Sequence, residues 1–488
     1  MSRFNTPTLV RVPIQGDSVN LAGGEAFSVT PEYELAAIAL TSFVKDQFYR
    51  SKDEVLARIR ELIVKVSPEY AARVALYARR EAGMRSISHV IAGELAGVRM
   101  AGARAFYRDI VRRPDDMFEI MAYTKLRLNK GRKSKTHAMV AGFRAAIEKM
   151  GPYQLAKYQG QPGAIRMVDM VNLCHPKPSE TNREALSLLV KGELKEQDTW
   201  ESRLSVLGAD KAKVWGDLLS EGKLGYFATL RNLRNIAEQA PEQVTNACAV
   251  LTDPERARKS LVLPFRAATA YREIAKTQVA ARQEIMRALS KAADLLMSSV
   301  PEFTGRMLVV LDCSGSMRGA QGYKPVMDFA SVFAATLYKR NALNADLMLF
   351  GADAVYSSLD ADTPLLSIAD KVAEHDGGGT DFKPIFTRAK GKYARVVILS
   401  DMQGWMAFTG PTGAYEDYCR REGCRPKVFS FDLAGYGALQ FPQQDVFCLA
   451  GYSDRALALI PLLEQDKGAL VNVVKAYKVG RDESEEAA

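Results

Sequence analysis

The sequence predicts two unlike parts: an α-helical repeat array (an α-solenoid) over residues 1–304 and an α/β domain over residues 305–480. Three observations predict this division. Apolar residues recur at helical spacing from about residue 30 to residue 300, with breaks roughly every 15–20 residues. From about residue 305, short apolar runs alternate with helical segments, which predicts a mostly parallel sheet covered on both faces. The balance of charge changes at the same point.

Composition places the chain among ordinary soluble globular proteins. It has 488 residues, of which 47% are hydrophobic and 25% charged. No run reaches the roughly 18 consecutive apolar residues of a membrane span, and the N-terminus lacks a signal-peptide pattern. Six cysteines without paired spacing fit a reducing compartment. We therefore expect a cytoplasmic protein that does not enter a membrane.

The net charge of +9 is distributed unevenly. Residues 301–488 carry 20 Lys+Arg and 24 Asp+Glu, a balance of −4, whereas residues 1–300 carry 46 and 33, a balance of +13. An excess of this kind predicts a polyanionic partner, most simply nucleic acid, for the first part. A basic surface that only aids solubility is the alternative interpretation.

Helix start signals punctuate the first part. Thr30 and Ser67 are each followed by proline, which pairs an N-cap hydroxyl with a residue favoured in the first turn. Between them, Val55, Ile59 and Leu62 lie on one helical face. Successive amphipathic helices with short links predict stacked helical hairpins. Periodicity alone fits a helical bundle equally well.

Strands and helices alternate in the second part. The runs at 307–312, 345–350, 393–401 and 427–433 read as strands, and residues 325–340, 365–373, 415–421 and 454–463 read as helices. In such sheets ligands bind beyond the carboxyl ends of the strands. Residues 481–488 form an acidic tail.

Oxygen-bearing side chains gather at that expected ligand edge. Asp312, Ser314 and Ser316 follow the first strand, Thr380 lies in the glycine-rich run 377–379, and Asp401 follows a later strand. Carboxylate and hydroxyl oxygens suit Mg²⁺ or another divalent cation. The alternative is that the serines cap the next helix while the aspartates only end strands.

This spacing resembles the von Willebrand factor A domain. The resemblance implies a metal-ion-dependent adhesion site with Asp312, Ser314 and Ser316 as ligands, completed directly or through water by Thr380 and Asp401. Enzyme patterns fit less well, because Ser314 stands where a dehalogenase-type phosphotransferase needs a second aspartate. Asp312 likewise occupies the glycine position of a hydrolase elbow. We therefore expect no enzymatic activity.

A basic segment marks the helical part. Residues 125–135 contain six cations and no acid, among them Lys130, Arg132, Lys133 and Lys135. A helix is expected over 136–149, so the cations precede a helix N-terminus, an arrangement suited to phosphate. A solvated run of charge is the alternative.

The whole chain is similar to the Ro autoantigen family, in its bacterial or phage Ro-sixty-related branch. The segment 130–179, the run GYFATLRNLRN at 225–235 and LPFR at 263–266 resemble its TROVE module, named for telomerase, Ro and vault proteins. A TROVE module followed by a von Willebrand factor A domain is the Ro architecture. The resemblance implies HEAT-like helical repeats closed into a ring, with the A domain joining the ends.

The resemblance also implies RNA partners. Y RNA would bind the basic outer surface, and 3′ single-stranded ends of misfolded or decaying RNA would pass through the central hole. The family further implies association with polynucleotide phosphorylase through Y RNA, and we expect the protein itself to be a monomer. The implied RNA-contacting residues are Lys130, Arg132, Lys133, Lys135, His137, Arg144, Arg166 and Lys177, with Arg231, Arg234 and Arg266 near the hole.

Two other functions remain open on the sequence. A Mg²⁺-dependent protein-adhesion or assembly factor would make the basic helices incidental. A nuclease would need several clustered carboxylates in the basic region, which that region lacks.

Overall fold

The computed structural model confirms the two predicted parts. It describes residues 18–19, 25–26, 30–41, 52–128, 136–160, 163–205, 210–260, 262–279, 281–300, 302–318, 326–402, 411–433, 446–450 and 469–480. A two-residue pair of strands, β1 (Ser18–Val19) and β2 (Glu25–Ala26), precedes the helices. The predicted helix over 454–463 and the acidic tail lie outside the described residues.

The helical part reads as a run of short helices. They are α1 (Pro31–Thr41), α2 (Lys52–Lys65), α3 (Pro68–Arg80), α4 (Ser86–Glu94), α5 (Ala103–Asp109), α6 (Pro114–Leu128), α7 (His137–Glu148), α8 (Pro152–Lys157), α9 (Met167–Cys174), α10 (Arg183–Lys191), α11 (Trp200–Ser205), α12 (Lys211–Ser220), α13 (Tyr226–Gln239), α14 (Val244–Leu251), α15 (Pro254–Ser260), α16 (Pro264–Ala275) and α17 (Arg282–Leu296).

The helices start where capping chemistry predicts. The hydroxyl of Thr30 accepts a hydrogen bond from the backbone N–H of Tyr33 at 3.3 Å, and Ser67 accepts one from Tyr70 at 3.2 Å. Each cap satisfies a backbone donor that the first turn would otherwise leave unpaired. The predicted apolar stripe on α2 is buried, so this helix packs through the face that its periodicity indicated.

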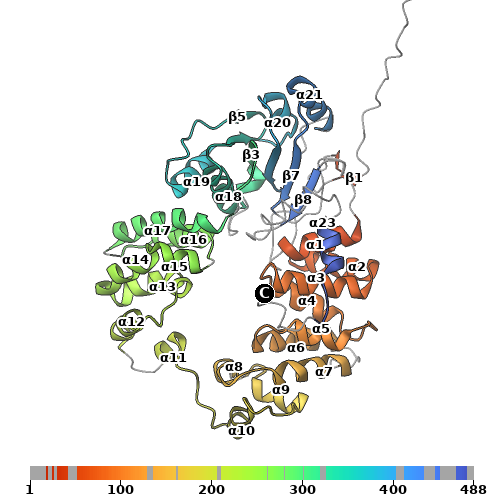
Figure 1. Ribbon diagram of the computed structural model, residues 1–488, viewed down its shortest axis with the longest axis vertical. Helices are drawn as coiled ribbons and strands as arrows, with labels where there is room; N and C mark the ends of the chain where they lie inside the picture. The colour runs from red at the N-terminus through yellow and green to blue at the C-terminus, as the bar shows by residue number, and fades with distance from the viewer. Residues whose placement is uncertain are drawn as a thin grey trace, which may run out of the picture.

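The helices follow a curved path that closes into a ring (Figure 1). The α/β domain joins the two ends, because α16 and α17 contact its helices α18 (Val326–Arg340) and α19 (Leu365–Glu374), while α1 contacts its last strand. A ring closed by the second domain is the arrangement predicted from the sequence.

The second part contains a six-stranded sheet in the order β5-β4-β3-β6-β7-β8. All neighbouring strands are parallel except β4 and β5. The strands are β3 (Met307–Asp312), β4 (Ala345–Phe350), β5 (Ala354–Tyr356), β6 (Arg395–Ser400), β7 (Lys427–Asp432) and β8 (Val446–Ala450), and further helices are α20 (Lys383–Arg388), α21 (Thr412–Glu422) and α23 (Ala469–Ala476).

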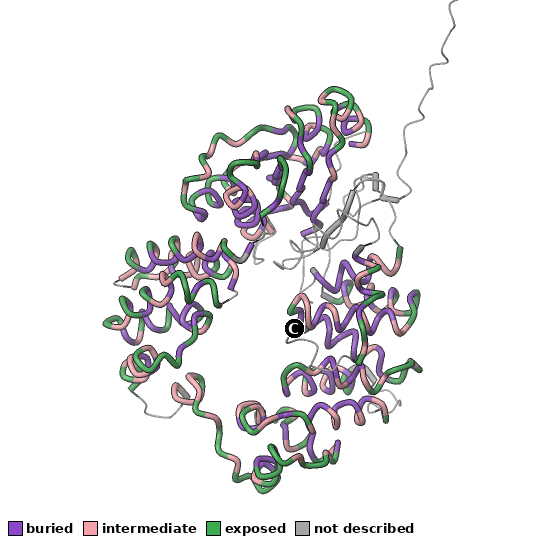
Figure 2. Tube along the Cα trace, in the orientation of Figure 1, coloured by how far each residue is buried: buried purple, intermediate pink, exposed green. Residues whose placement is uncertain are grey.

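Both faces of this sheet are covered. On β3, Val309 and Leu311 belong to the core shared with α18 and α19, whereas Leu308 and Val310 belong to a separate core that includes side chains of α20 and α21. This alternation follows from the two-residue period of a strand. The central strands appear in Figure 2 as continuous buried segments.

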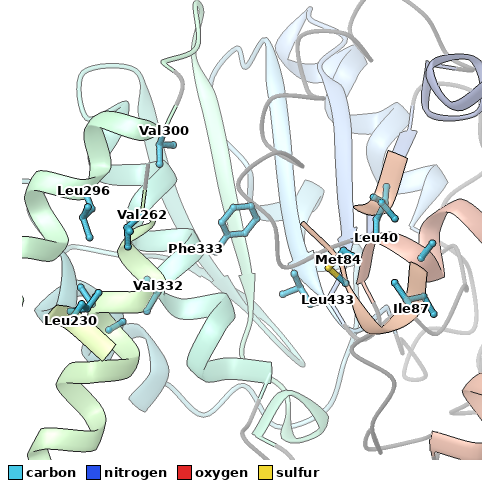
Figure 3. Close-up of a cluster of buried hydrophobic side chains, with 14 of the residues drawn as sticks. Leu40, Met84, Ile87, Leu230, Val262, Leu296, Val300, Val332, Phe333 and Leu433 are labelled. Atoms are coloured by element: carbon cyan, nitrogen blue, oxygen red, sulfur yellow. The ribbon is translucent and has the colours of Figure 1, made fainter. Parts of the chain in front are cut away.

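One hydrophobic core runs from the helical part onto the sheet (Figure 3). At the seam, Phe265 of α16 stacks on Phe329 of α18 with ring centroids 4.3 Å apart. Phe333 continues this contact toward Phe431 on β7 at 5.2 Å. Because this seam is apolar and well packed, it holds the α/β domain firmly against this end of the ring.

The last described helix, α23, packs on α1 and α3. The rings of Tyr477 and Tyr77 meet edge to face at 5.7 Å, and the Arg73 guanidinium donates to the carbonyl of Lys475 at 2.8 Å. Residues 469–480 therefore pack against the first helices, a contact that we call the C-terminal clasp.

The domain limits at 304 and 480 stay predictions. Among the described residues, no helix combines the length and apolar character that crossing a bilayer requires.

Candidate functional site

Asp312 lies at the centre of the predicted metal edge. It ends β3, between β4 and β6, and its side chain is fully buried. Its Oδ1 accepts a hydrogen bond from the backbone N–H of Ser314 at 2.9 Å, and its Oδ2 accepts one from the hydroxyl of Ser400 at 2.5 Å. Both carboxylate oxygens are thus held in fixed positions.

The two serines of the first loop lie side by side. The hydroxyl oxygens of Ser314 and Ser316 are 3.3 Å apart, with Ser314 buried and Ser316 half-buried. They occupy the tight turn that begins a short 3₁₀ helix at Gly315. The predicted ligand loop therefore presents a carboxylate and two hydroxyls from five consecutive residues.

The glycine-rich loop is fastened to this first loop through its backbone. The N–H of Gly377 donates to the carbonyl of Cys313 at 3.0 Å, and the N–H of Gly315 donates to the carbonyl of Gly378 at 3.1 Å. These bonds bring the segment that carries Thr380 against the loop that carries the serines. Thr380 is 1% exposed.

Asp401 completes the edge from β6. It directly follows Ser400, which is hydrogen-bonded to Asp312, and it is buried. The structure therefore brings the three predicted segments together at one end of the sheet. Ser400 is a participant that the sequence analysis did not assign, although its place at the end of a neighbouring strand was a usable signal.

The donor set fits a hard divalent cation. Burial raises the pKa of Asp312 above its ordinary value, opposed by the hydrogen bonds from Ser314 and Ser400. A cation at this edge would favour the ionised carboxylate, and all the donors are oxygens, as Mg²⁺ prefers. Within the described ranges, no three His, Cys, Asp or Glu side chains cluster as a metal site.

Four cations of the basic segment, Lys130, Arg132, Lys133 and Lys135, lie outside the described residues. The helix that follows them, α7, is present as predicted, with Thr136 accepting a hydrogen bond from Met139 at 3.3 Å. His137 is the first residue of α7 and is exposed.

The other cations predicted in this region have different surroundings. The Nε of Arg144 donates to the carbonyl of Cys174 at 2.6 Å, so this side chain also ties α7 to the end of α9. Arg166 precedes α9, where it is exposed and 3.7 Å from Asp169. Lys177 follows α9 with an exposed side chain. Arg166 and Lys177 therefore lie at opposite ends of α9, an eight-residue helix about 12 Å long.

Three of the predicted cations line a single pocket. Arg231 and Arg234 of α13 and Arg266 of α16 surround a cavity of about 390 Å³. Phe227 also lines it, with the Arg266 guanidinium 5.7 Å from the centre of its ring. Phe227 was not predicted from the sequence, although it lies in the run 225–235 together with both arginines of α13.

A comparison with family models identifies the chain. The TROVE domain model matches residues 36–196 and 190–313, which together are more than half of the sequence. The chain belongs to the TROVE domain family. This match confirms the resemblance to the TROVE module that was drawn from the motifs.

The fold of this TROVE protein is similar to a solved structure described as the Ro (Rsr) protein of Deinococcus radiodurans. The TM-score is 0.60 at 19% sequence identity, and the match covers 88% of this chain and 99% of that one. This similarity confirms the helical-repeat ring with its A-type domain. Proximal thread matrix protein 1 from the mussel byssus matches with a TM-score of only 0.24, at 14% identity over 40% of this chain and 52% of that one. A search of curated proteins finds no match.

Proposed function

We propose that this TROVE protein is a noncatalytic scaffold in RNA quality control and decay. It binds small noncoding Y RNA on the basic outer surface of its helical part. The 3′ single-stranded ends of misfolded or decaying RNA enter the ring. Y RNA links the protein to polynucleotide phosphorylase, and the protein acts as a monomer in the cytoplasm.

One observation carries the proposal. The segment that matches the TROVE model, residues 36–313, falls almost entirely within the part of the chain that holds the positive excess of +13. Clustered cations attract the phosphate backbone irrespective of base sequence, and counterion release makes such binding strong at low salt. The protein would therefore select the RNAs that it binds by their charge and by a free end, and not by their base sequence.

The A-type domain contributes a metal site in this proposal. Asp312, Ser314, Ser316, Thr380 and Asp401 would hold Mg²⁺ or another divalent cation. The cation would supply an electrophilic centre for an acidic oxygen of a partner. The fixed orientation of Asp312 and the all-oxygen donor set support this assignment.

The test compares three labelled RNAs of equal length: a blunt hairpin, a hairpin with a 5′ tail and a hairpin with a 3′ tail. We expect the 3′-tailed hairpin to bind most tightly and to stay intact in the presence of Mg²⁺. Equal affinity for the blunt and the 3′-tailed hairpins would contradict the proposed end selection. Metal-dependent shortening that is lost in Asp312→Ala would contradict the noncatalytic role.

A second function, metal-dependent protein adhesion, is favoured by the three-segment edge around Asp312. The adhesion function and the RNA function predict different results for Asp312→Ala. If adhesion is the main role, this variant loses its protein partner, and wild-type protein prepared at low salt carries no nucleic acid. If the RNA proposal is right, nucleic acid co-purifies with wild type and with Asp312→Ala alike.

A further inference from the structure

The pocket between α13 and α16 is formed by two helices that lie side by side and run in the same direction. Near their starts, Arg266 of α16 lies over the ring of Phe227 of α13. Further along, the negative charge of Glu273 on α16 raises the pKa of Arg234 on α13. Because the early residues of one helix are near the early residues of the other, and the later ones near the later ones, the two helices are parallel.

Parallel packing places both helix N-termini at one end of the pocket. Neither N-cap residue, Gly225 for α13 or Leu263 for α16, caps its helix with a side chain. The positive ends of the two helix dipoles therefore add to the arginine charges at this end. An anionic group is favoured there.

Two of the three arginines are available to such a group. Arg234 is paired with Glu238 on its own helix at 2.8 Å, and this hydrogen bond raises the pKa of the guanidinium. In the part of the chain that the structure describes, neither Arg231 nor Arg266 has a carboxylate partner. Guanidinium groups without a carboxylate partner can bind phosphate with two hydrogen bonds each.

The pocket also has an aromatic surface. Phe227 is 44% exposed, whereas Leu230, Leu233 and Ile236 of the same helix are buried. Leu233 and Ile274, each 1% exposed, form an apolar floor beside it. A cavity of about 390 Å³ lies within the range of small-ligand sites.

We propose that this pocket binds one unpaired nucleotide of an RNA strand, with the base stacked on Phe227 and the adjoining phosphate held by Arg231 and Arg266. The inference rests on the proposed RNA-binding function and adds a base-stacking contact to it. An acidic peptide would use the arginines but not the aromatic face, so the nucleotide explains both features. Stacking is tolerant of sequence, because every base has a π-face.

The test uses two labelled probes of equal length, an adenosine oligonucleotide and an abasic oligonucleotide with the same phosphates, in fluorescence anisotropy. Phe227→Ala should weaken binding of the adenosine probe about tenfold and leave the abasic probe unchanged, whereas Phe227→Tyr should bind both like wild type. The paired variant Arg231→Ala/Arg266→Ala should weaken both probes and lower the slope of log K against log salt by about 0.7, because the two arginines neutralise one phosphate of a single strand. The exposed, ion-paired Arg258 supplies the control, Arg258→Ala, which should bind both probes like wild type.

The outcomes separate this inference from the function on which it rests. If wild type binds the 3′-tailed hairpin but Phe227→Ala binds the adenosine probe equally well, the pocket assignment is overturned while the RNA-binding function stands. If wild type binds no RNA at all, both fall. Displacement of the adenosine probe by an acidic peptide that binds equally well to Phe227→Ala would indicate a protein ligand and would also overturn the assignment.

Discussion

Gly351→Ala should damage the metal edge from outside the predicted ligand set. Gly351 follows β4, and a Cβ atom there would lie 2.1 Å from the carbonyl oxygen of Gly377. Ordinary contact begins at 3.4 Å, so the two backbones must separate by about 1.3 Å. That movement strains the hydrogen bonds from Ala352 to Gly377 at 2.7 Å and from Gly377 to Cys313 at 3.0 Å. It therefore displaces the loop that carries Thr380.

Overpacking costs about 1–3 kcal/mol, and each weakened backbone hydrogen bond adds about 1 kcal/mol. We expect Gly351→Ala to lower the free energy of unfolding by about 3–5 kcal/mol, measured by urea unfolding. Any increase in that free energy on addition of Mg²⁺ should disappear. Gly413→Ala is the control, because a Cβ there meets nothing within 4 Å. A Gly351→Ala protein with wild-type stability and a wild-type response to Mg²⁺ would show that Gly351 does not hold the loop of Thr380 in place.

Three other predictions test the metal edge, a buried ion pair and the C-terminal clasp. Mg²⁺ at a hundred times its dissociation constant should raise the free energy of unfolding of wild type by about 2.7 kcal/mol and leave that of Asp312→Asn unchanged. An equal rise in both proteins would contradict the predicted Mg²⁺ site at Asp312. Burial raises the pKa of Asp116, but a hydrogen bond with His89 and the charge of Arg79 more than offset this and hold it below its ordinary value. The stability that the ionised Asp116 adds is present above the unfolded pKa of about 3.9 and is lost as pH falls. Asp116→Asn should therefore lower the free energy of unfolding by about 3–5 kcal/mol at pH 7, and this free energy should fall less steeply with acid than in wild type. Curves of unfolding free energy against pH that run parallel in the two proteins would contradict this. Deleting residues 469–488 removes α23, whose Leu470 and Val474 side chains are buried, so amide exchange in α1 and α3 should accelerate, and unchanged exchange would argue against the clasp.

Local chemistry made the architecture and the metal edge predictable. The apolar run that ends at Asp312 could be read as a buried strand, and the carboxyl ends of parallel strands share one edge. Three segments with oxygen donors could therefore be assigned to one site. The hydrogen bond from Ser400 to Asp312 spans 88 residues and depends on how β3 and β6 are paired, which no local pattern specifies.

The RNA-contacting surfaces were less predictable, because a charge in a sequence has no partner until the chain folds. Arg144 reads as one more cation on a basic helix, but its guanidinium reaches a carbonyl on α9. Arg231 and Arg266 are 35 positions apart, and only the parallel packing of α13 and α16 brings them to one pocket. Phe227 reads as an ordinary core residue until its exposure is known.

The salt dependence of RNA binding shows whether the cations of the helical part hold the RNA through its phosphates. Affinity for the 3′-tailed hairpin should be measured from low to moderate salt for wild type and for the variant in which Lys130, Arg132, Lys133 and Lys135 are all replaced by alanine. We expect a steep linear fall of log K with log salt for wild type. The variant's slope should be shallower by about 3–4, since each phosphate neutralised in a duplex contributes about 0.9. A slope near zero in wild type, or equal slopes in both proteins, would contradict this expectation.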